Sequence, residues 1–426
     1  MECIVSIIVK IQFIGRHILK NLYLFLALIL LLSSCSSLFK SRADLKVVHY
    51  NIKELDSQKI KDFDIQVQKA NEILKEFDFN VLSLNEVQYD YPNIPNKSFT
   101  SKGENIKKFM MKLGRDYELW KTSFYPANTG QRAQKLNNQN YPANFQTPNI
   151  MNYADQWNFG IYPGQYSSGL SFDLIPYGNP IVINKLKWKE FNPKVNLNKF
   201  KQADGLVINK NIELFDKNFV DTPVEIDGEV VHIITLHTVP SYHFGNKSSP
   251  NYKRNADQLR FLEWYTTGKT DIEVSLPGIQ PLPPNSYFVA LGDWNTDIRN
   301  LKNQGSRVLK NYFKKVNVWI GENYDLTHEA DGYHPNRLKL LLDYIVTSKN
   351  MKIIKGKIHA PSEERLFLGC EPPNLEKLKL PAHRVLVHYF DKSVGKKCYV
   401  SISKKFKNYK DASDHFPISA DIKLIK

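Results

Sequence analysis

The sequence feature that most constrains the fold is a buried strand that ends in a run of polar side chains. The apolar run Tyr287–Leu291 predicts a strand, and Gly292 directly after it allows a sharp turn of the backbone. Asp293, Asn295 and Asp297 follow at alternate positions. In α/β proteins, binding sites form at the carboxyl ends of strands, because the rigid sheet holds the loops there. The segment therefore predicts an α/β fold with a polar site at this strand end.

Two carboxylates and an amide in this spacing also indicate a chemistry. Hard divalent cations take oxygen ligands, and a carboxylate beside such a cation can activate a water molecule. The alternative is an ordinary polar turn after a strand. The other strands of the chain bear on this choice.

Residues 1–35 have the pattern of a bacterial targeting segment. Three basic residues precede the apolar run Leu22–Leu32, which ends at Ser33, Ser34 and Cys35. The run has the length of a signal-peptide core and is shorter than the roughly 20 residues that cross a bilayer. The Leu-Ser-Ser-Cys sequence resembles a lipobox, in which the cysteine is lipidated and becomes the new N-terminus.

We therefore expect a lipoprotein signal peptide at 1–35, lipidation of Cys35 and a short tether at 36–44. The mature protein is predicted to lie outside the cytoplasm in the bacterial cell envelope, held to a membrane by its lipid. The alternative is a signal anchor that is retained, because a second apolar stretch runs from Ile4 to Ile14.

Composition favours one large domain over residues 45–426. The chain has 426 residues, of which 42% are hydrophobic, so it can bury a sizeable core. No linker, repeat or low-complexity tract divides the sequence. The formal net charge of +15 predicts attraction to polyanions, although a positive balance also serves solubility alone.

Cysteine use is compatible with an exported protein. After cleavage and lipidation, Cys370 and Cys398 are the two cysteines left to pair. A disulfide between them is the expectation in an oxidising compartment, and two reduced thiols are the alternative. No Cys-x-x-Cys motif is present, which argues against thiol chemistry and structural zinc.

The first strands of the chain also end in polar residues. Leu45–Tyr50 predicts a strand that ends at Asn51, and Val81–Leu84 predicts one that ends near Glu86. Apolar residues at helical spacing from Ile60 to Phe77 predict a helix between them. A strand, helix and strand in this order form a parallel pair with a right-handed crossover, which places both polar residues at one sheet edge.

The same arrangement recurs later in the sequence. The strand predicted at Val230–Leu236 ends at His237, and a strand predicted at Leu338–Thr347 contains Asp343. The last strand, Phe416–Leu424, directly follows Asp414 and His415. We expect these side chains to converge on one edge of the sheet.

Residues 88–176 are the least regular part, with one predicted helix at Glu104–Leu113. The segment is rich in Tyr, Asn, Pro and Gln. A long connection of this kind is either functional or partly disordered, and its aromatic content favours an ordered loop that faces the substrate. A further helix is predicted at Tyr252–Tyr265 and a short strand at Pro180–Ile183.

Taken together, eight polar residues resemble the motifs of the endonuclease/exonuclease/phosphatase superfamily, which includes pancreatic DNase. They are Asn51, Glu86, His237, Asp293, Asn295, Asp343, Asp414 and His415. The motifs are Tyr-Asn at the first strand end, Leu-Asn-Glu-Val-Gln, Gly-Asp-Trp-Asn, Leu-Asp-Tyr-Ile-Val and Ser-Asp-His-Phe-Pro. They occur in the order of the superfamily and span residues 45–424.

The resemblance implies a four-layer α/β sandwich of two packed mixed β-sheets flanked by helices. It also implies hydrolysis of phosphate esters with a divalent metal ion, usually Mg²⁺, with Mn²⁺ or Ca²⁺ as alternatives. By position, Glu86 resembles the principal metal ligand, Asn51 its supporting ligand, and Asp414 the carboxylate that completes the hydration shell of the metal.

The remaining motif residues resemble the groups that act on water and phosphate. Asp293 is expected to orient and deprotonate the attacking water, and Asn295 to hold water or phosphate. Asp343 is expected to orient His415, which would donate to the phosphoryl oxygens. A histidine at His237, as in nuclease and sphingomyelinase branches, could protonate the leaving oxygen.

Two features depart from this simple picture. The phosphate-binding Arg or Tyr expected between Ile183 and His237 has no match. This region contains no arginine and offers Lys185, Lys187, Lys201 and Lys210 as cations. His49 and His232 lie within strand patterns, and we expect them to be core or solvent-facing residues rather than catalytic ones.

The sequence therefore favours an extracytoplasmic, Mg²⁺-dependent phosphodiesterase whose substrate is nucleic acid, with no obligate protein partner. The alternatives are a sphingomyelinase-like phospholipase C, a phosphomonoesterase, or an inactive surface binding module. Sphingomyelinases tend to have an exposed apolar hairpin for membrane entry, and the sequence shows no contiguous loop of this kind.

A cluster of lysines before Asp414 bears on the substrate. If this segment flanks the cleft, its lysines can contact phosphates on both sides of the cut, as a polymer requires. The alternative is an exposed hairpin whose lysines are solvated. The residues are Lys392, Lys396, Lys397, Lys404, Lys405, Lys407 and Lys410.

The targeting interpretation can be tested directly. Cys35→Ala is expected to abolish lipidation, because the acyl group is attached to that thiol, and to yield soluble protein or uncleaved precursor. The measurement is incorporation of labelled palmitate and partition of the protein between membrane and soluble fractions. Equal labelling of the variant and the parent protein would contradict the assignment.

Overall fold

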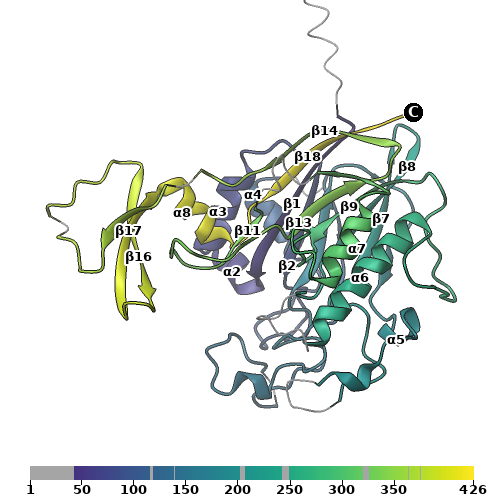
Figure 1. The fold of residues 1–426 in the computed structure, drawn as a ribbon, viewed down its shortest axis with the longest axis horizontal. Coiled ribbons are helices and arrows are strands. Elements are labelled where there is room, and N and C mark those ends of the chain that lie inside the picture. The colour runs from purple at the N-terminus through teal and green to yellow at the C-terminus, as the bar shows by residue number, and fades with distance from the viewer. Residues whose placement is uncertain are drawn as a thin grey trace, which may run out of the picture. The chain divides into compact units, whose positions relative to one another are not determined.

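The computed structural model describes residues 43–426, except for 116–118, 139, 202–206, 242–248, 320–325, 363 and 375. Cys35, the signal peptide and residues 36–42 of the predicted tether lie outside the described residues. Asp44–Lys426 form one structural unit (Figure 1). No helix among the described residues combines the length and apolar character that crossing a membrane requires.

Two mixed β-sheets form the centre of this unit. The first has the strand order β14 (Met351–Ile358), β18 (Ile418–Leu424), β1 (Leu45–Leu55), β2 (Val81–Val87), β4 (Ser167–Phe172) and β3 (Lys121–Phe124). The second has the order β10 (Asn317–Trp319), β13 (Asp343–Thr347), β9 (Tyr287–Asp293), β8 (Glu229–Leu236), β7 (Phe219–Ile226) and β5 (Ile175–Pro176), and β6 (Ile181–Ile183) also pairs with β7. Each sheet has a parallel pair at its centre, β1 with β2 and β8 with β9, whereas the other neighbours are antiparallel.

Helices cover the outer faces of both sheets, so the unit has the four layers that the family resemblance implied. The first sheet is covered by α2 (Ser57–Asp62), α3 (Ile65–Leu74), α4 (Asn105–Leu113) and α8 (Lys404–Ala412). The second is covered by α5 (Trp188–Phe191), α6 (Pro250–Thr267) and α7 (Gln304–Tyr312), of which α6 and α7 lie in front of β7 and β9 in Figure 1. The predicted α/β sandwich is thus confirmed.

The alternation of side chains along each strand decides what lies between the sheets. In β1, Leu45 and Val47 belong to the core shared with the second sheet, whereas Val48 and Tyr50 pack outward with the helices. Successive residues of a strand point to opposite faces. His49, at the next alternate position after Val47, therefore lies on the face between the sheets and not in an outer layer.

Strand register explains why residues far apart in the sequence meet. β13 runs antiparallel to β9, so Asp343 at the start of β13 is paired with Asp293 at the end of β9. β18 runs antiparallel to β1, so the residues that precede β18 lie near the end of β1, where Asn51 stands. The predicted convergence is therefore present, but the residues come from two packed sheets and not from one sheet.

Two elements differ from the sequence prediction in their extent. The single helix predicted from Ile60 to Phe77 is divided into α2 and α3, because Phe63 adopts a left-handed conformation and Asp64 caps a new helix by accepting from the amide of Val67 at 3.0 Å. The strand predicted at Leu338–Thr347 is interrupted at residues 341–342, which separate β12 (Lys339–Leu340) from β13. β12 instead pairs with β11 (His328–Glu329).

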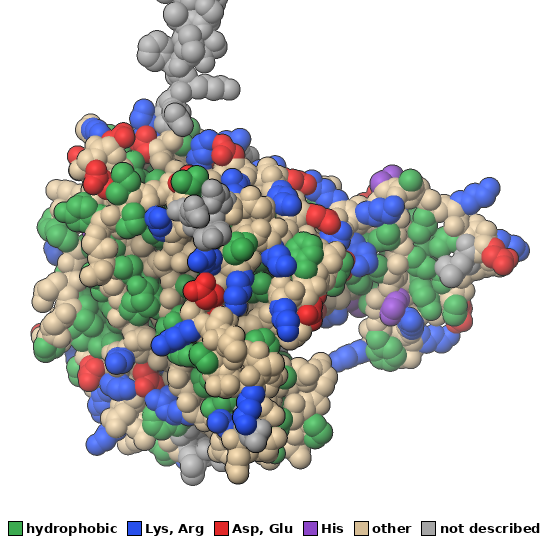
Figure 2. Space-filling model, turned by 180° about the vertical axis from the view of Figure 1, so that it is seen from behind, with side chains coloured by type: hydrophobic (Ala, Val, Ile, Leu, Met, Phe, Trp, Pro, Cys, Tyr) green, Lys and Arg blue, Asp and Glu red, His purple; other side chains and the backbone are tan. Residues whose placement is uncertain are grey.

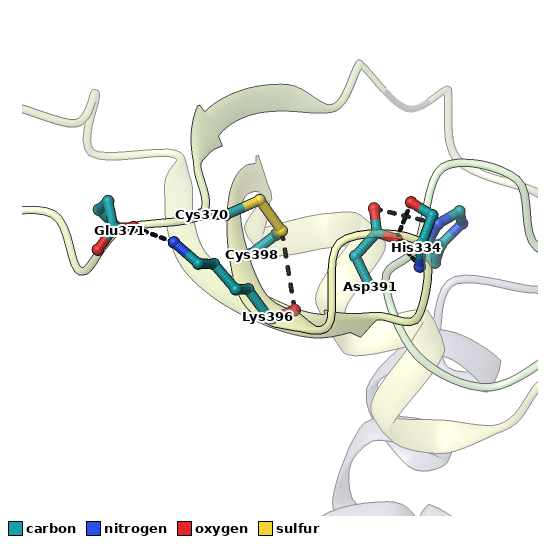
Figure 3. Close-up of a disulfide and its surroundings, with 7 residues drawn as sticks. His334, Cys370, Glu371, Asp391, Lys396 and Cys398 are labelled. Atoms are coloured by element: carbon teal, nitrogen blue, oxygen red, sulfur yellow. Dashed lines mark hydrogen bonds and ion pairs between the residues drawn. A yellow bond between two sulfur atoms is a disulfide. The ribbon is translucent and has the colours of Figure 1, made fainter.

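A third, three-stranded sheet lies at one end of the unit. It consists of β15 (Leu366–Gly369), β17 (Lys396–Ser403) and β16 (Arg384–Asp391), and a disulfide joins Cys370, just after β15, to Cys398 in β17 (Figure 3). Its inner side chains, including Val387, Val400 and Ile402, belong to the outer core of the first sheet. The disulfide thus connects two segments of this sheet beside that core.

The third sheet also gathers apolar side chains that are separate in the sequence. Leu366, Phe367, Phe390 and Val394 are each more than half exposed, and hydrophobic side chains are visible on this part of the surface in Figure 2. They do not form one contiguous loop, because they lie on β15, on β16 and in the turn after β16. In the register of the sheet, Phe390 is paired with Lys397 and Phe367 with Val400.

The lysines before Asp414 are divided between two elements. Lys392 lies in the turn between β16 and β17, and Lys396 and Lys397 lie on β17, where Lys396 pairs with Glu371 at 2.7 Å. The remaining four lie on α8. On α8, Lys407 pairs with Asp411, whereas Lys410 donates to the main-chain oxygen of Glu329 at 2.5 Å. They do not form one continuous row, which favours the solvated alternative for the hairpin lysines.

Buried polar contacts anchor the irregular segment against the second sheet. Arg254 of α6 donates to the main-chain oxygen of Glu213 at 2.7 Å and to Asn158 Oδ1 at 2.6 Å. The Glu213 carboxylate accepts from Asn158, Arg132 and Lys187 at 2.8–3.0 Å. The segment also contains a short 3-10 helix at Ile150–Asn152, and a second one lies at Leu197–Lys199. These contacts order the predicted loop.

The Glu213 contacts predict a pH-dependent contribution to stability. Burial raises the pKa of Glu213, but Lys187 and Arg132 lower it to about 2 overall. Because the folded pKa lies below that of the unfolded chain, the stabilisation is present above about pH 4.5 and is lost as the pH falls towards 2. Glu213→Gln should lower the free energy of unfolding at pH 7 by about 1–3 kcal/mol, and by less at pH 3, in urea titrations.

Glu76→Gln is the matched control, because the Glu76 carboxylate is exposed and lies 3.9 Å from Lys405. An exposed pair at this distance should change the free energy of unfolding by less than about 0.5 kcal/mol. Equal losses for the two variants, or a loss for Glu213→Gln that is the same at pH 3 and pH 7, would contradict the proposed role of Glu213.

Candidate active site

Asn51 connects two carboxylates that come from different sheets. Its side-chain amide donates to Glu86 Oε1 and to Asp293 Oδ2, both at 3.0 Å. Its own Oδ1 accepts from the amide of Lys53 at 3.0 Å. Asn51 therefore holds the two carboxylates together across the sandwich, while its oxygen is occupied by the main chain.

Asp293 is held in place from three further directions. Its main-chain amide donates to Asn85 Oδ1 at 2.8 Å, and its Oδ1 accepts from the amide of Asn295 at 2.7 Å. Gly292 allows β9 to approach β8 closely, since a Cβ there would lie 1.8 Å from the main-chain oxygen of Leu236. The predicted turn directly after Leu291 is wrong, because Gly292 lies inside β9 and is paired with Tyr344; the glycine serves the close approach of two strands.

His415 is paired with Asp343 in a buried chain of hydrogen bonds. The Nδ1 of His415 donates to Asp343 Oδ2 at 2.8 Å, and the other oxygen of Asp343 lies 3.1 Å from the Nε2 of His49. The Nδ1 of His49 lies 3.1 Å from Ser83 Oγ. His49 is buried, as expected for a core residue, but it also contacts the aspartate that orients His415, which the sequence interpretation missed.

This arrangement favours a protonated His415. Burial lowers the pKa of His415, but the carboxylates of Asp343 and Asp293 outweigh it and raise the pKa to about 10. Burial likewise raises the pKa of Asp343, whereas the charge and hydrogen bond of His415, with those of His49, hold that pKa below its usual range. His415 and Asp343 therefore form a buried ion pair at neutral pH.

Glu86 and Asp293 have the opposite electrostatic environment. Burial, with the nearby charge of Asp414, raises the pKa of Glu86 to about 7. Burial also raises the pKa of Asp293, although His415 partly offsets this. Asp414 differs, because its hydrogen bond with His328 and the charge of His415 hold its pKa below the usual range despite burial. Glu86 and Asp293 are thus the two carboxylates of the site whose negative charge is least compensated by neighbouring cations.

His237 lies at this site but in a neutral state. Burial, with the charges of Lys217 and His415, lowers the pKa of His237 well below its usual value. Its Nε2 accepts from Asn295 Nδ2 at 3.0 Å and lies 3.5 Å from Asp293 Oδ2. Its Nδ1 has no hydrogen-bond partner among the described residues. A neutral imidazole that accepts at Nε2 differs from the proton donor that the family resemblance suggested.

Two groups of side chains have the geometry to hold a metal ion. Glu86, His237 and Asp293 each offer a ligand atom, and these atoms lie within 4.8 Å of one another. The same holds for His328, Asp414 and His415. The first group brings together the carboxylates whose pKa values are raised.

Three contributors to the site escaped the sequence interpretation. His328 lies 3.8 Å from Asp414, and its ring packs edge-on against His415. Asn85 binds the main chain of Asp293, and Lys217 pairs with Asp216 at 2.8 Å near His237. Lys217 lies between Ile183 and His237, where the family resemblance predicts a phosphate-binding side chain. In the sequence, its position two residues before strand β7 could have indicated that it lies close to the site.

Two residues singled out in the sequence lie apart from this cluster. Asp297 accepts from Arg299 Nε at 2.8 Å and from the amide of Leu341 at 3.2 Å. His232 pairs with Asp221 at 2.8 Å, in agreement with its predicted non-catalytic character. The other eight motif residues lie at the adjoining ends of β1, β2, β8, β9, β13 and β18.

Left-handed backbone conformations are concentrated around the site. Lys53, Glu54, Glu86, Tyr166 and Asn295 all have φ between +47° and +64°. Such conformations are unfavourable for residues with a Cβ and persist where the surrounding structure imposes them. The register shifts in β1 and β2 adjoin these positions, so the strand ends are shaped to direct side chains into the site.

Comparison with known proteins gives structural matches. An endonuclease/exonuclease/phosphatase family protein from Leptotrichia buccalis C-1013-b is 12% identical over 89% of this chain and 100% of that chain, with a TM-score of 0.46. Beta toxin 275-280 from Staphylococcus aureus is 16% identical over 88% of this chain and 99% of that chain, with a TM-score of 0.41.

D. rerio TDP2 complexed with single strand DNA product is 11% identical over 89% of this chain and 99% of that chain, with a TM-score of 0.40. No protein-family model and no curated protein sequence matches this chain. Because all three identities are below 25% and all three TM-scores are below 0.5, the roles of the residues in this site rest on the geometry of this chain alone.

The contact between His49 and Asp343 gives a testable prediction. His49→Leu should leave Asp343 Oδ1 without its donor and lower the free energy of unfolding by about 1–3 kcal/mol, because the carboxylate is buried. His49→Gln places an amide N–H where the Nε2–H stood and should retain more of that stability. Urea unfolding of both variants measures the difference. Equal losses in the two variants would show that packing of the imidazole, and not its hydrogen bond, is what matters.

Proposed function

We propose that this protein is a metal-dependent phosphoesterase that hydrolyses phosphodiester bonds. The observation that carries the proposal is the combination of a cationic His415, held by Asp343, with the carboxylate of Asp293 at 3.7 Å from His415 Nε2. A phosphodiester is anionic and resists attack, so its hydrolysis requires positive charge at the phosphoryl oxygens and a positioned nucleophile.

In the proposed reaction, His415 donates a hydrogen bond from Nε2 to a non-bridging phosphoryl oxygen. Asp293 accepts a proton from the attacking water, and its raised pKa suits a base that works near neutral pH. Asn51 and Asn295 fix the orientation of the Asp293 carboxylate. His237 contributes a hydrogen-bond acceptor to Asn295.

The carboxylates of the site fit a hard divalent cation. Glu86 and Asp293 offer oxygen ligands, and Asp414 lies close enough to raise the pKa of Glu86 by repulsion. A positive charge at Glu86 would relieve this repulsion and favour the ionised carboxylate. We propose Mg²⁺, with Mn²⁺ or Ca²⁺ as alternatives; when bound, it polarises the phosphoryl group as a Lewis acid. Asn51 would act here by orienting Glu86.

We propose nucleic acid as the substrate class, acting from a lipid-anchored position outside the cytoplasm. The support is the formal net charge of +15, which favours a polyanion, and the targeting pattern that ends at Cys35. Lys53, which lies 3.9 Å from Asp414 and is one-third exposed, is placed to meet a phosphate beside the site. The hairpin lysines contribute less than the sequence suggested.

A specific observation favours a second candidate, a phospholipase C of the sphingomyelinase kind. The third sheet exposes Leu366, Phe367, Phe390 and Val394 together with Lys396 and Lys397. Exposed apolar side chains beside lysines are typical of surfaces that enter an anionic membrane interface. The substrate on which the protein acts therefore has to be tested on both polymers and lipids.

The central prediction concerns chemistry. Protein without residues 1–35 should hydrolyse bis(p-nitrophenyl) phosphate with Mg²⁺ and should lose this activity in EDTA. Asp293→Asn and His415→Ala should each lower kcat by at least about 100-fold, because each removes a group that acts in the transition state. Circular dichroism should remain unchanged. Near-normal rates in both variants would refute the site.

The same protein should be assayed on DNA, RNA and sphingomyelin under one set of conditions. Glu76→Gln serves as the control, because Glu76 lies on the surface away from the motif residues. Cleavage of nucleic acid supports the first candidate. Hydrolysis of sphingomyelin without cleavage of either polymer would overturn the substrate class and leave the reaction class intact.

A further inference from the structure

A cavity of about 240 Å³ opens beside the candidate active site. One wall is formed by Glu54, Asp56 and Lys59, which follow the end of the regular part of β1. The opposite wall is formed by residues 143–146 and 161–165 of the irregular segment, with Phe145 and Tyr162 among them. The volume accommodates a single small ring system.

The cavity adjoins the carboxylate site through Glu54. The main-chain amide of Glu54 donates to Glu86 Oε2 at 3.2 Å, and the hydroxyl of Tyr166 donates to Glu54 Oε1 at 2.9 Å. Glu54 is therefore shared by the wall of the cavity and the surroundings of Glu86. A group in the cavity would therefore lie near Glu86, the residue proposed to bind the cation.

Charge determines which group the cavity accepts. Glu54 and Asp56 contribute two carboxylates, whereas Lys59 donates its Nζ to the main-chain oxygen of Glu54 at 2.7 Å. Asp56 is the N-cap of α2, and its Oδ1 accepts from the amide of Lys59 at 2.8 Å. Two carboxylates repel phosphate, so the cavity favours an uncharged or cationic group that donates hydrogen bonds.

Aromatic and amide side chains complete the cavity. The ring of Phe145 is more than one-third exposed and stacks on Phe159, with ring centroids 6.0 Å apart and an angle of 10° between the planes. Asn144 and Gln146 flank Phe145 and also line the cavity. A partly exposed ring beside amides and carboxylates provides one stacking face and several hydrogen-bond acceptors.

We propose that this cavity binds the base of the nucleotide that carries the scissile phosphate, and that it prefers bases rich in N–H donors. Guanine presents adjacent imino and amino donors, which match a carboxylate, and its ring system can stack on Phe145. Thymine presents one donor between two carbonyl acceptors, which the carboxylates would repel. The proposal rests on the proposed phosphodiesterase activity and names a base preference for it.

The test uses three small p-nitrophenyl diesters, in which only the non-leaving group differs. They carry deoxyguanosine, thymidine or a methyl group on the phosphate. KM for the deoxyguanosine ester should be at least about fivefold below that for the thymidine ester. Phe145→Ala should raise KM for the deoxyguanosine ester by roughly tenfold, because stacking is lost, and should leave kcat/KM for the methyl ester unchanged.

Two further variants separate hydrogen bonding from stacking. Asp56→Asn keeps a side chain that can cap α2 but replaces a carboxylate oxygen with an amide, so the preference for deoxyguanosine should shrink towards one. Met151→Ala is the matched control, because Met151 is an exposed side chain of the same segment that does not line the cavity. Its kinetics on all three esters should match those of the parent protein.

The outcomes distinguish this inference from the proposed function. Hydrolysis of all three esters with equal KM, or equal losses on the methyl ester in Phe145→Ala, would overturn the base subsite and leave the phosphodiesterase activity standing. Failure to hydrolyse any ester would overturn the proposed function. Equilibrium binding of dGMP and dTMP then tests the cavity itself, and equal dissociation constants would overturn it.

Discussion

The site depends on one packing constraint. The two sheets share an apolar core, and the side chains on their inner faces become polar at one edge of that core. Along β1 the inward positions are Leu45, Val47, His49 and Asn51, and the first two belong to the shared core. Along β9 the inward positions run through Val289 and Leu291 to Asp293. Because alternation fixes these faces, the same packing that excludes water from the centre also brings polar groups together at the strand ends.

Those polar groups stay buried because each has a specific partner. Asn51 bridges Glu86 and Asp293, Asp343 is shared by His49 and His415, and Asn85 binds the main chain of Asp293. Unpaired buried charges are costly, so the network stabilises a geometry that an isolated loop could not hold. The carboxylates that remain in excess are those that face the proposed cation. Structural support and chemical function are thus divided among neighbouring residues.

The sequence predicts the strand ends well because they depend on local pattern. The runs before Asn51, Glu86 and Asp293 are apolar, regular and followed by turn residues, and strand order then determines that they meet. The protonation state of His237 could not be predicted in this way, because it depends on burial and on Lys217, which is near in space. The helix boundary at Phe63 was also missed, since a left-handed conformation leaves little trace in the pattern of apolar residues.

Contacts between residues that are far apart in the sequence could not be predicted from the sequence. His49 and Asp343 are 294 positions apart, and the exposed apolar residues of the third sheet come from β15, from β16 and from the turn after β16. Each side chain has an unremarkable local pattern, so only strand pairing reveals the group to which it belongs. Local pattern predicts the strand ends on which most motif residues lie, whereas the family resemblance supplies the order that joins the eight residues into one site.

The position of β18 determines when the site can be completed as the chain folds. β18 is the last strand along the chain, yet it lies inside the first sheet between β14 and β1, and it follows directly on Asp414 and His415. A growing or partly folded chain therefore lacks both residues at the site, however well its earlier strands have paired. The proposed site would therefore be completed only when β18 pairs with β1 and β14. A chain in which β18 has not yet paired would be inactive.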